Sequence, residues 1–305
     1  MCRMLRRARQ VPRLARRRSV TALNRALGRI ELRKAVAGEI PLSHPPVFIV
    51  GAPRSGSTLL YQLMVVRFDV GYLSNLHCRL HGAPALVERV AGRRLEPPAV
   101  FSSDHGRTDG LAAPSECGPY WYRFFRKSPQ HVPLEEADSG ALRDLRASVR
   151  ALGDAAGRPV VFKNLLNSLR LEPLGAAFPE AIFLVVQRNL ADNVASILEA
   201  RRTVRGDEAA WWSAEPPDVD RLRGRPPEAQ AAGQVRGIHA LIDSAKQRLG
   251  ADRFLDIAYE HLCADTHAVL SEVSRFASSH GLELAQRRPV PPHFEAGRGS
   301  RLQQA

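Results

Sequence analysis

Short apolar runs alternate with amphipathic stretches along most of the chain. Four such runs predict buried strands, at residues 47–50, 159–162, 181–186 and 254–259. Apolar residues at helical spacing predict helices after residue 58 and at residues 134–152, 168–178, 190–202, 228–249 and 264–279. Strands that alternate with helices are typical of a parallel sheet covered on both faces. The sequence therefore predicts an α/β fold with a central parallel sheet flanked by helices.

A loop of small residues joins the first predicted strand to the first helix. It reads Gly51-Ala52-Pro53-Arg54-Ser55-Gly56-Ser57-Thr58 and nearly matches the phosphate loop of nucleoside-triphosphate enzymes, G-x-x-x-x-G-K-[ST]. Ser57 stands where the motif has its lysine, and the cationic side chain of the loop is Arg54, three residues before that position. Because a helix start supplies free N–H groups and a positive dipole end, this loop predicts an anion site. The loop fits a single phosphate-like group, and we expect no metal.

Three predicted strands carry a cation where they end. Arg54, Lys163 and Arg188 each follow an apolar run. Ligands in open parallel sheets bind beyond the carboxyl ends of the strands, so we expect these cations to share one site. The chain holds only four lysines among its 44 basic residues, which singles out Lys163.

The positive charge of the chain is concentrated near its start. Residues 1–34 contain twelve of the basic residues and one acid, so they carry +11 of the net +13. The 305 residues suit one large domain. We therefore expect a basic arm at residues 1–40, helical or partly disordered, one domain at 41–290 and a tail at 291–305. The alternatives for the arm are a solvated helix, contact with nucleic acid, and peripheral contact with a membrane.

Other features narrow the class of protein. No apolar run reaches the roughly 18 to 20 residues of a membrane span, and the N-terminus lacks the apolar core of a secretory signal. The four cysteines form no C-x-x-C pair. We expect a cytoplasmic protein, with membrane association of the basic arm as a further possibility.

The loop and two later motifs together closely resemble those of sulfotransferases that use 3′-phosphoadenosine 5′-phosphosulfate (PAPS). The loop resembles the 5′-phosphosulfate loop of tyrosyl-protein and carbohydrate sulfotransferases. Arg188 and Ser196, eight residues apart, match the family's 3′-phosphate pair, and Tyr259-Glu260 matches a late strand end whose tyrosine lies near the adenine. The resemblance spans roughly residues 47–284. It implies a sulfotransferase fold related to the nucleotide kinases and the product adenosine 3′,5′-bisphosphate.

The resemblance also implies roles for individual residues. Donor binding would fall to the loop and the two later motifs: Arg54, Ser55, Gly56, Ser57, Thr58, Arg188, Ser196 and Tyr259. Arg54 would contact the 5′-phosphate and the leaving oxygen, and Lys163 the transferring sulfuryl group. The transfer is expected to be in-line, with the enzyme positioning groups and stabilising charge.

The general base is open at the level of the sequence. The glutamate that tyrosyl-protein sulfotransferases carry after their first helix is absent here. The candidates are Glu116, Asp104, His105, His77 and His81. We favour Glu116, which stands just before an aromatic cluster at residues 120–125.

The sequence leaves the acceptor unspecified. A carbohydrate, a lipid-linked hydroxyl or a small molecule would all suit the chemistry. The aromatic residues Trp121, Tyr122, Trp211 and Trp212 would line the acceptor pocket or belong to the core, and residues 206–227 would form a lid or a plain insertion. The alternative function is that of a P-loop kinase or phosphotransferase, which Ser57 in place of lysine disfavours.

Overall fold

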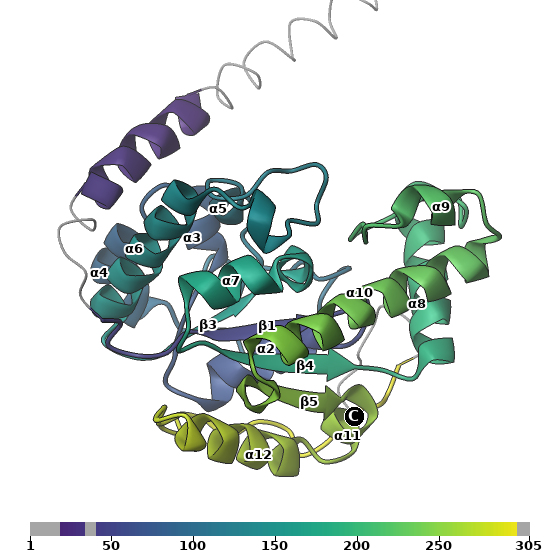
Figure 1. Ribbon diagram of the computed structural model, residues 1–305. Helices are drawn as coiled ribbons and strands as arrows, with labels where there is room; N and C mark the ends of the chain where they lie inside the picture. Colours follow the sequence, from purple (N-terminus) through teal and green to yellow (C-terminus); the bar gives the residue numbers. More distant parts are fainter. Residues whose placement is uncertain (1–18, 34–40, 298–305) are drawn as a thin grey trace, which may run out of the picture.

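The computed structural model describes residues 19–33 and 41–297, and its centre is a five-stranded parallel sheet (Figure 1). The strands are β1 (Val47–Gly51), β2 (Gly71–Tyr72), β3 (Val160–Lys163), β4 (Ile182–Gln187) and β5 (Phe254–Ala258). Their order is β2-β3-β1-β4-β5, and every pair is parallel. The predicted α/β fold with a helix-flanked parallel sheet is confirmed.

Four of the five strands are those that the apolar runs predict, each within two residues at either end. β2 is the exception, because two residues give no periodicity to detect. The last predicted strand was one residue too long. Tyr259 begins the next helix instead, which turns its ring from the sheet toward the loop after β1.

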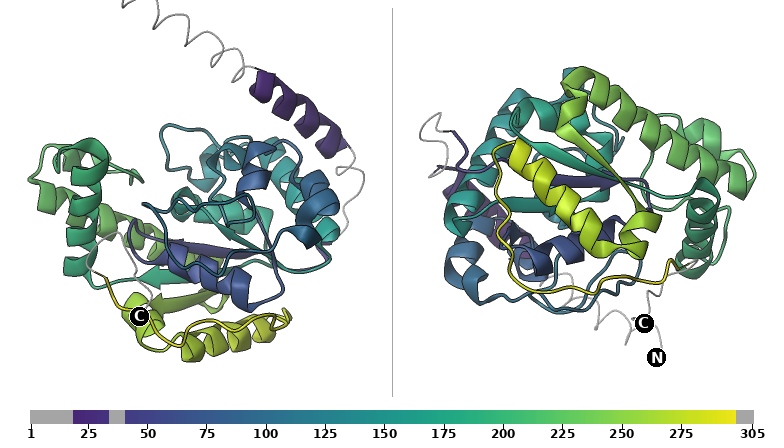
Figure 2. Two further views of the ribbon diagram at one scale, coloured as in Figure 1. Left: turned by 180° about the vertical axis from the view of Figure 1, so that it is seen from behind. Right: turned by 90° about the horizontal axis from the view of Figure 1, so that it is seen from below.

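Helices connect the strands and cover both faces of the sheet. A helix spans residues 19–33. The others are α2 (Ser57–Arg67), α3 (Asn75–Arg79), α4 (Pro84–Ala91), α5 (Gly118–Trp121), α6 (Ser139–Ala156), α7 (Leu171–Ala177), α8 (Leu190–Arg205), α9 (Val219–Arg223), α10 (Pro227–Leu249), α11 (Tyr259–Ala264) and α12 (Thr266–Ser279). Figures 1 and 2 show α7 and α10 on one face of the sheet, and α2 and α12 on the other.

Two predicted helices begin later than their periodicity suggests. The stretch at 134–152 opens with a short 3-10 turn, Leu134–Glu136, and α6 starts only after Asp138. The Asp138 carboxylate accepts the Ala141 amide proton at 2.6 Å and so caps the helix. The stretch at 168–178 is divided at Arg170 into a 3-10 turn and α7.

The core consists of two layers, one on each face of the sheet, and successive side chains of β1 point alternately into one layer and the other. Phe48 and Val50 face the layer under α7 and α10, where Phe48 stacks on Phe162 and Phe183 at centroid distances of 5.5 and 5.6 Å. Val47 and Ile49 face α2 and α12. Trp121, Tyr120, Phe124 and Phe125 belong to the first layer, whereas Tyr122 is half-buried and outside it.

The two ends of the chain are described in part. The sequence predicts a basic arm at 1–40, of which residues 1–18 and 34–40 lie outside the described residues, and a tail at 291–305, of which 298–305 do. The division into arm, domain and tail stays a prediction. No helix in the described ranges is long and apolar enough to cross a membrane.

Candidate active site

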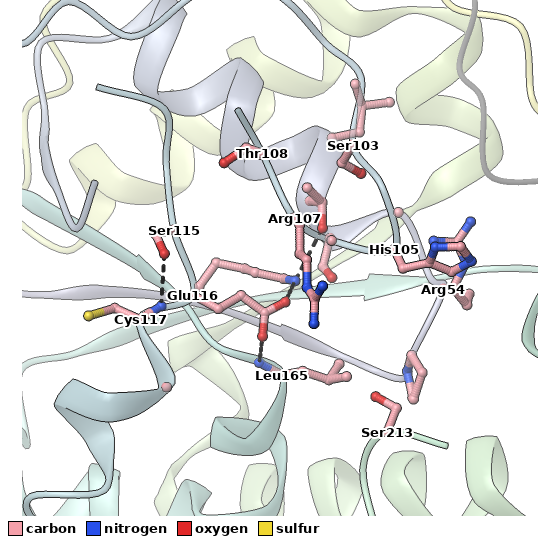
Figure 3. A pocket seen from close by; sticks show the side chains of 18 of the residues that line it. Arg54, Ser103, His105, Arg107, Thr108, Ser115, Glu116, Cys117, Leu165 and Ser213 are labelled. Atoms are coloured by element: carbon pink, nitrogen blue, oxygen red, sulfur yellow. Dashed lines mark hydrogen bonds and ion pairs between the residues drawn. The ribbon is translucent and has the colours of Figure 1, made fainter. Parts of the chain in front are cut away.

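A cavity of about 690 Å³ opens at the carboxyl ends of β1, β3 and β4. Its walls come from segments far apart in the sequence: the loop after β1, residues 103–109, residues 115–119, and single residues that follow the other strands (Figure 3). Arg54, Lys163 and Arg188 all line it. The structure thus brings together the three cations that the strand ends predict.

The loop after β1 has the backbone shape of an anion site. Arg54 and Gly56 adopt left-handed φ angles of 64° and 95°, and such angles in a turn are typical of backbone concavities that bind anions. Helix α2 begins at Ser57, and no side chain caps it. The first amides of α2 therefore have no helical acceptor and are available to an anion.

Two buried residues that sequence reasoning missed hold this loop in place. Ser168 exchanges two hydrogen bonds with Gly51, since its hydroxyl accepts the Gly51 amide and donates to the Gly51 carbonyl, each at 2.9 Å. Asn193, on α8, donates to the Pro53 carbonyl at 2.6 Å. Neither residue stands in a motif, so nothing in the sequence marks them.

The residues predicted to bind the donor's two phosphates lie side by side. Arg54 Nε donates to Ser196 Oγ at 3.1 Å, and an Arg188 amino group donates to the Arg54 carbonyl at 3.3 Å. The Arg188 guanidinium lies over the Tyr259 ring, 4.6 Å from its centroid. The same ring packs on Gly56, where an added Cβ would lie 2.1 Å from Tyr259 Cδ2. The loop, the Arg188–Ser196 pair and Tyr259 therefore form one unit.

This unit has an excess of positive charge and unused donors. Among the described residues no carboxylate pairs with Arg54 or Arg188. Burial, and then the nearby Arg188 charge, hold the pKa of Arg54 below its usual value. Arg188 Nε and Ser55 Oγ are buried with no hydrogen-bond partner in the described part of the chain. Buried donors without partners are costly, so the arrangement fits an anionic ligand.

Lys163 and Glu116 form an ion pair at the centre of the cavity. Lys163 is 5% exposed; its ammonium contacts the Glu116 carboxylate and donates to Thr58 Oγ1 at 3.1 Å. The second carboxylate oxygen of Glu116 accepts the Leu165 amide at 3.2 Å (Figure 3). Gly106 packs over the pair, with a virtual Cβ 3.3 Å from the Glu116 carboxylate. The cation predicted for the sulfuryl group thus contacts the favoured base.

The other candidate bases differ in whether they line the cavity. His77 is buried away from the cavity, where it caps α3 and contacts Glu88 at 3.2 Å. His81 contacts the Cys78 carbonyl and does not line the cavity. His105 lines it, with Nδ1 bonded to Asp104 at 2.6 Å and a buried Nε2 that has no described partner. Glu116 and the Asp104–His105 pair therefore remain.

The wall of the cavity away from the loop mixes polar and apolar groups. Asn75 and Cys78 of α3 line it, together with Trp212. The Trp212 ring meets the His105 ring edge-on at 6.0 Å. Trp121 is core, and Trp211 lies against Arg201, 5.1 Å from its centroid. Of the four aromatic residues proposed from the sequence, Trp212 alone is among the residues that line this cavity.

The cavity of the described chain contains no cluster of three metal-ligating side chains. Its charged lining residues are the Lys163–Glu116 pair, the arginines Arg54, Arg107 and Arg188, and Asp109.

Comparison with known proteins places the chain in one family and finds relatives of that family. The profile of a family described as the sulfotransferase family matches residues 45–283. Omega-hydroxy-beta-dihydromenaquinone-9 sulfotransferases of Mycobacterium bovis and Mycobacterium tuberculosis are each 24% identical over 253 residues. That alignment covers 76% of this chain and 62% of theirs, so the chain spans under two thirds of the length of these relatives.

Solved structures resemble the fold. A sulfotransferase of Mycobacterium avium superposes with a TM-score of 0.54 at 18% identity, covering 83% of this chain and 70% of that one. A sulfotransferase of Mycobacterium tuberculosis superposes with a TM-score of 0.52 at 17% identity, covering 84% and 72%. At these identities the likeness extends to the fold alone.

Proposed function

Because the chain belongs to the sulfotransferase family, we propose that it transfers a sulfuryl group from PAPS to an acceptor hydroxyl. One observation carries the choice of donor: Arg54, Arg188 and Ser196 meet at the phosphate-type loop without a carboxylate partner among the described residues. Two adjacent guanidinium groups that lack acidic partners suit a ligand with two phosphate-like groups.

The donor would lie along the unit formed by the loop, the Arg188–Ser196 pair and Tyr259. Its phosphosulfate would accept hydrogen bonds from the first amides of α2, with the hydroxyls of Ser57 and Thr58 beside them. The 3′-phosphate would bind Arg188 and Ser196, and the adenine would lie near Tyr259. Arg188 Nε, which has no described partner, would gain one on binding.

The transfer itself breaks one bond to sulfur and forms another. The acceptor oxygen attacks sulfur while the bond from sulfur to the phosphate oxygen breaks, and the acceptor proton passes to a base. Lys163 and Arg54 would stabilise the charge that grows on the sulfuryl and leaving oxygens. An anionic donor would draw the Lys163 ammonium away from Glu116, which would leave that carboxylate free to accept the proton.

The acceptor is proposed to be a hydroxyl on a lipid-linked or other small molecule. The Mycobacterium relatives are named as sulfotransferases of a hydroxylated dihydromenaquinone. The wall built by Asn75, Cys78 and Trp212 would hold the acceptor opposite the loop. The kinase alternative is disfavoured by the family match and by Ser57 at the lysine position.

The test is a turnover assay that compares donors. The full chain is incubated with PAPS or with ATP and magnesium, alone and with long-chain and prenylated alcohols. We expect acceptor-dependent release of adenosine 3′,5′-bisphosphate from PAPS and a sulfated alcohol by mass spectrometry. Turnover of ATP with no turnover of PAPS would contradict the proposal.

A further inference from the structure

The helix at residues 19–33 lies on the outer side of α3, α4 and α6, away from the sheet (Figures 1 and 2). One side of this helix holds it to the protein. Asn24 is buried, donates to the Arg79 carbonyl at 3.1 Å and accepts the Gly82 amide at 2.7 Å. Gly28 lets the helix approach closely, since a Cβ there would meet Arg123 at 3.3 Å. The helix is therefore fixed on the domain along this side.

A second side of the helix is apolar and exposed. Val20, Leu23 and Ile30 are 43%, 49% and 53% exposed, and Leu86 and Val90 of α4 are 49% and 69% exposed. Ile30 and Leu86 line one shallow groove of about 180 Å³ between the helix, α4 and α6. Leu23 lies two turns before Ile30, and Val90 one turn after Leu86.

We call the set Val20, Leu23, Ile30, Leu86 and Val90 the apolar face. It contains five of the nine large hydrophobic side chains that are exposed among the described residues. Scattered single exposures are ordinary on a protein surface, but a group of this kind marks an interaction site.

Exposed arginines lie on the same two helices as the apolar face. Arg25, Arg29 and Arg33 are exposed on the same helix, and Arg89 is exposed between the two apolar residues of α4. Residues 1–18, which precede the helix, include eight more arginines and no acid. The single acid of the helix, Glu31, accepts the Ala85 amide at 3.0 Å, so its carboxylate is directed into the protein.

We propose that the apolar face and the arginines of its two helices dock on the surface of an anionic lipid bilayer. Aliphatic side chains enter the boundary between headgroups and acyl chains, while arginines bind anionic headgroups. Nucleic acid would use the arginines and leave the aliphatic side chains exposed to water. A symmetric dimer through this face would bring two segments of charge +11 together, which opposes it.

The helix that carries much of the apolar face is connected to the cavity through α3. Asn24 bonds the carbonyl of Arg79 at the end of α3, and Asn75 and Cys78 of the same short helix line the cavity. One element therefore lies between the bilayer surface and the acceptor wall. For a lipid-linked acceptor this shortens the path from membrane to site, a consequence that rests on the proposed function, whereas the docking itself does not.

The test is sedimentation of the full chain with sucrose-loaded vesicles. Vesicles of phosphatidylcholine alone are compared with vesicles that also contain phosphatidylglycerol, at low and at high salt. We expect binding to the anionic vesicles, weakened by salt. A variant with Leu23→Gln, Ile30→Gln, Leu86→Gln and Val90→Gln keeps the charge and should bind at least about tenfold more weakly.

Two further variants keep the experiment decisive. Leu134→Gln with Val204→Gln removes exposed apolar side chains elsewhere and should bind like the wild type. Ile30→Trp should bind more tightly, because tryptophan favours the membrane interface, and this gain does not depend on how the fourfold variant folds.

Four results would overturn the proposal. The wild type could fail to bind anionic vesicles, or the fourfold variant could bind them as tightly as the wild type. Sedimentation velocity could also show that the wild type is a dimer and the fourfold variant a monomer. Displacement from vesicles by short DNA at equal charge would likewise favour nucleic acid as the partner. Because none of these readouts involves turnover, failure here is distinct from failure of the proposed sulfuryl transfer.

Discussion

Replacing Lys163 by methionine should remove most of the turnover while leaving the donor site intact. Lys163 is 5% exposed, so its ammonium acts in a medium far less polarisable than water. A full charge 4 Å away would interact by roughly 4 kcal/mol at an effective dielectric constant near 20. Only part of a charge develops on the leaving oxygen, and a charged hydrogen bond is also lost. We expect the barrier to rise by about 2–4 kcal/mol, which lowers kcat by about 30- to 1,000-fold.

The contact between Lys163 and Glu116 adds a second, sharper expectation. Glu116→Gln removes the proposed base and should lower kcat by about 100- to 10,000-fold. Since the two side chains touch, the double variant should lose much less than the product of the single losses. His105→Asn should cost under tenfold if Glu116 is the base. A loss at His105 that exceeds the loss at Glu116 would move the base to the Asp104–His105 pair.

The assay is steady-state release of adenosine 3′,5′-bisphosphate, with melting temperatures to check folding. Lys246→Met is the matched control, because it removes an ion pair with Asp256 outside the cavity. The control should keep kcat within a factor of about two, as expected for an exposed ion pair. A Lys163→Met enzyme with an unchanged kcat would refute the placement of Lys163 beside the reacting sulfur.

Three smaller perturbations test other parts of the structure. Gly56→Ala forces a Cβ into the Tyr259 ring at a left-handed φ, so it should lower the free energy of unfolding by about 2–4 kcal/mol and weaken nucleotide binding. Gly153→Ala, on an open helix surface, is the control and should have neither effect. Equal denaturation midpoints for the two variants would contradict this reasoning. A thiol hydrogen bond lowers the pKa of Cys78, so mass spectrometry should find it alkylated early near neutral pH, with loss of turnover that Cys78→Ser prevents. Burial raises the pKa of Glu31 to about 6. Below pH 4.5 the protonated carboxyl therefore stabilises the packing of the helix at residues 19–33 on the domain, and this stabilisation is lost as the pH rises through 6. Hydrogen exchange should show weaker protection of that helix at pH 7.5 than at pH 5, by roughly 1–2 kcal/mol, and Glu31→Gln should abolish the difference.

The sequence was informative where local pattern decides the structure. The apolar runs located β1, β3, β4 and β5, and the glycines and small residues around Arg54 located the loop between β1 and α2. The side-by-side placement of Arg54, Arg188 and Ser196 followed from strand ends and motif spacing.

Contacts between distant segments could not be read in this way. Glu116 and Lys163 are 47 residues apart, and their ion pair depends on how residues 103–118 fold over the sheet. The hydrogen bonds of Ser168 to Gly51 and of Asn193 to Pro53 also join segments with no local signal. The aromatic cluster at 120–125 had two interpretations, and only packing against Phe48 and Phe162 assigns Trp121 to the core.

The most direct test of the account is calorimetric titration of adenosine 3′,5′-bisphosphate into the full chain. The central claim is that Arg188, beside Arg54 and Ser196, holds the 3′-phosphate of the donor. The wild type should bind one equivalent, and Arg188→Ala should bind about 30-fold more weakly or worse, because a charged contact to phosphate is lost. Arg205→Ala, at the exposed end of α8, should bind like the wild type. No binding by the wild type, or equal binding by Arg188→Ala, would contradict the claim.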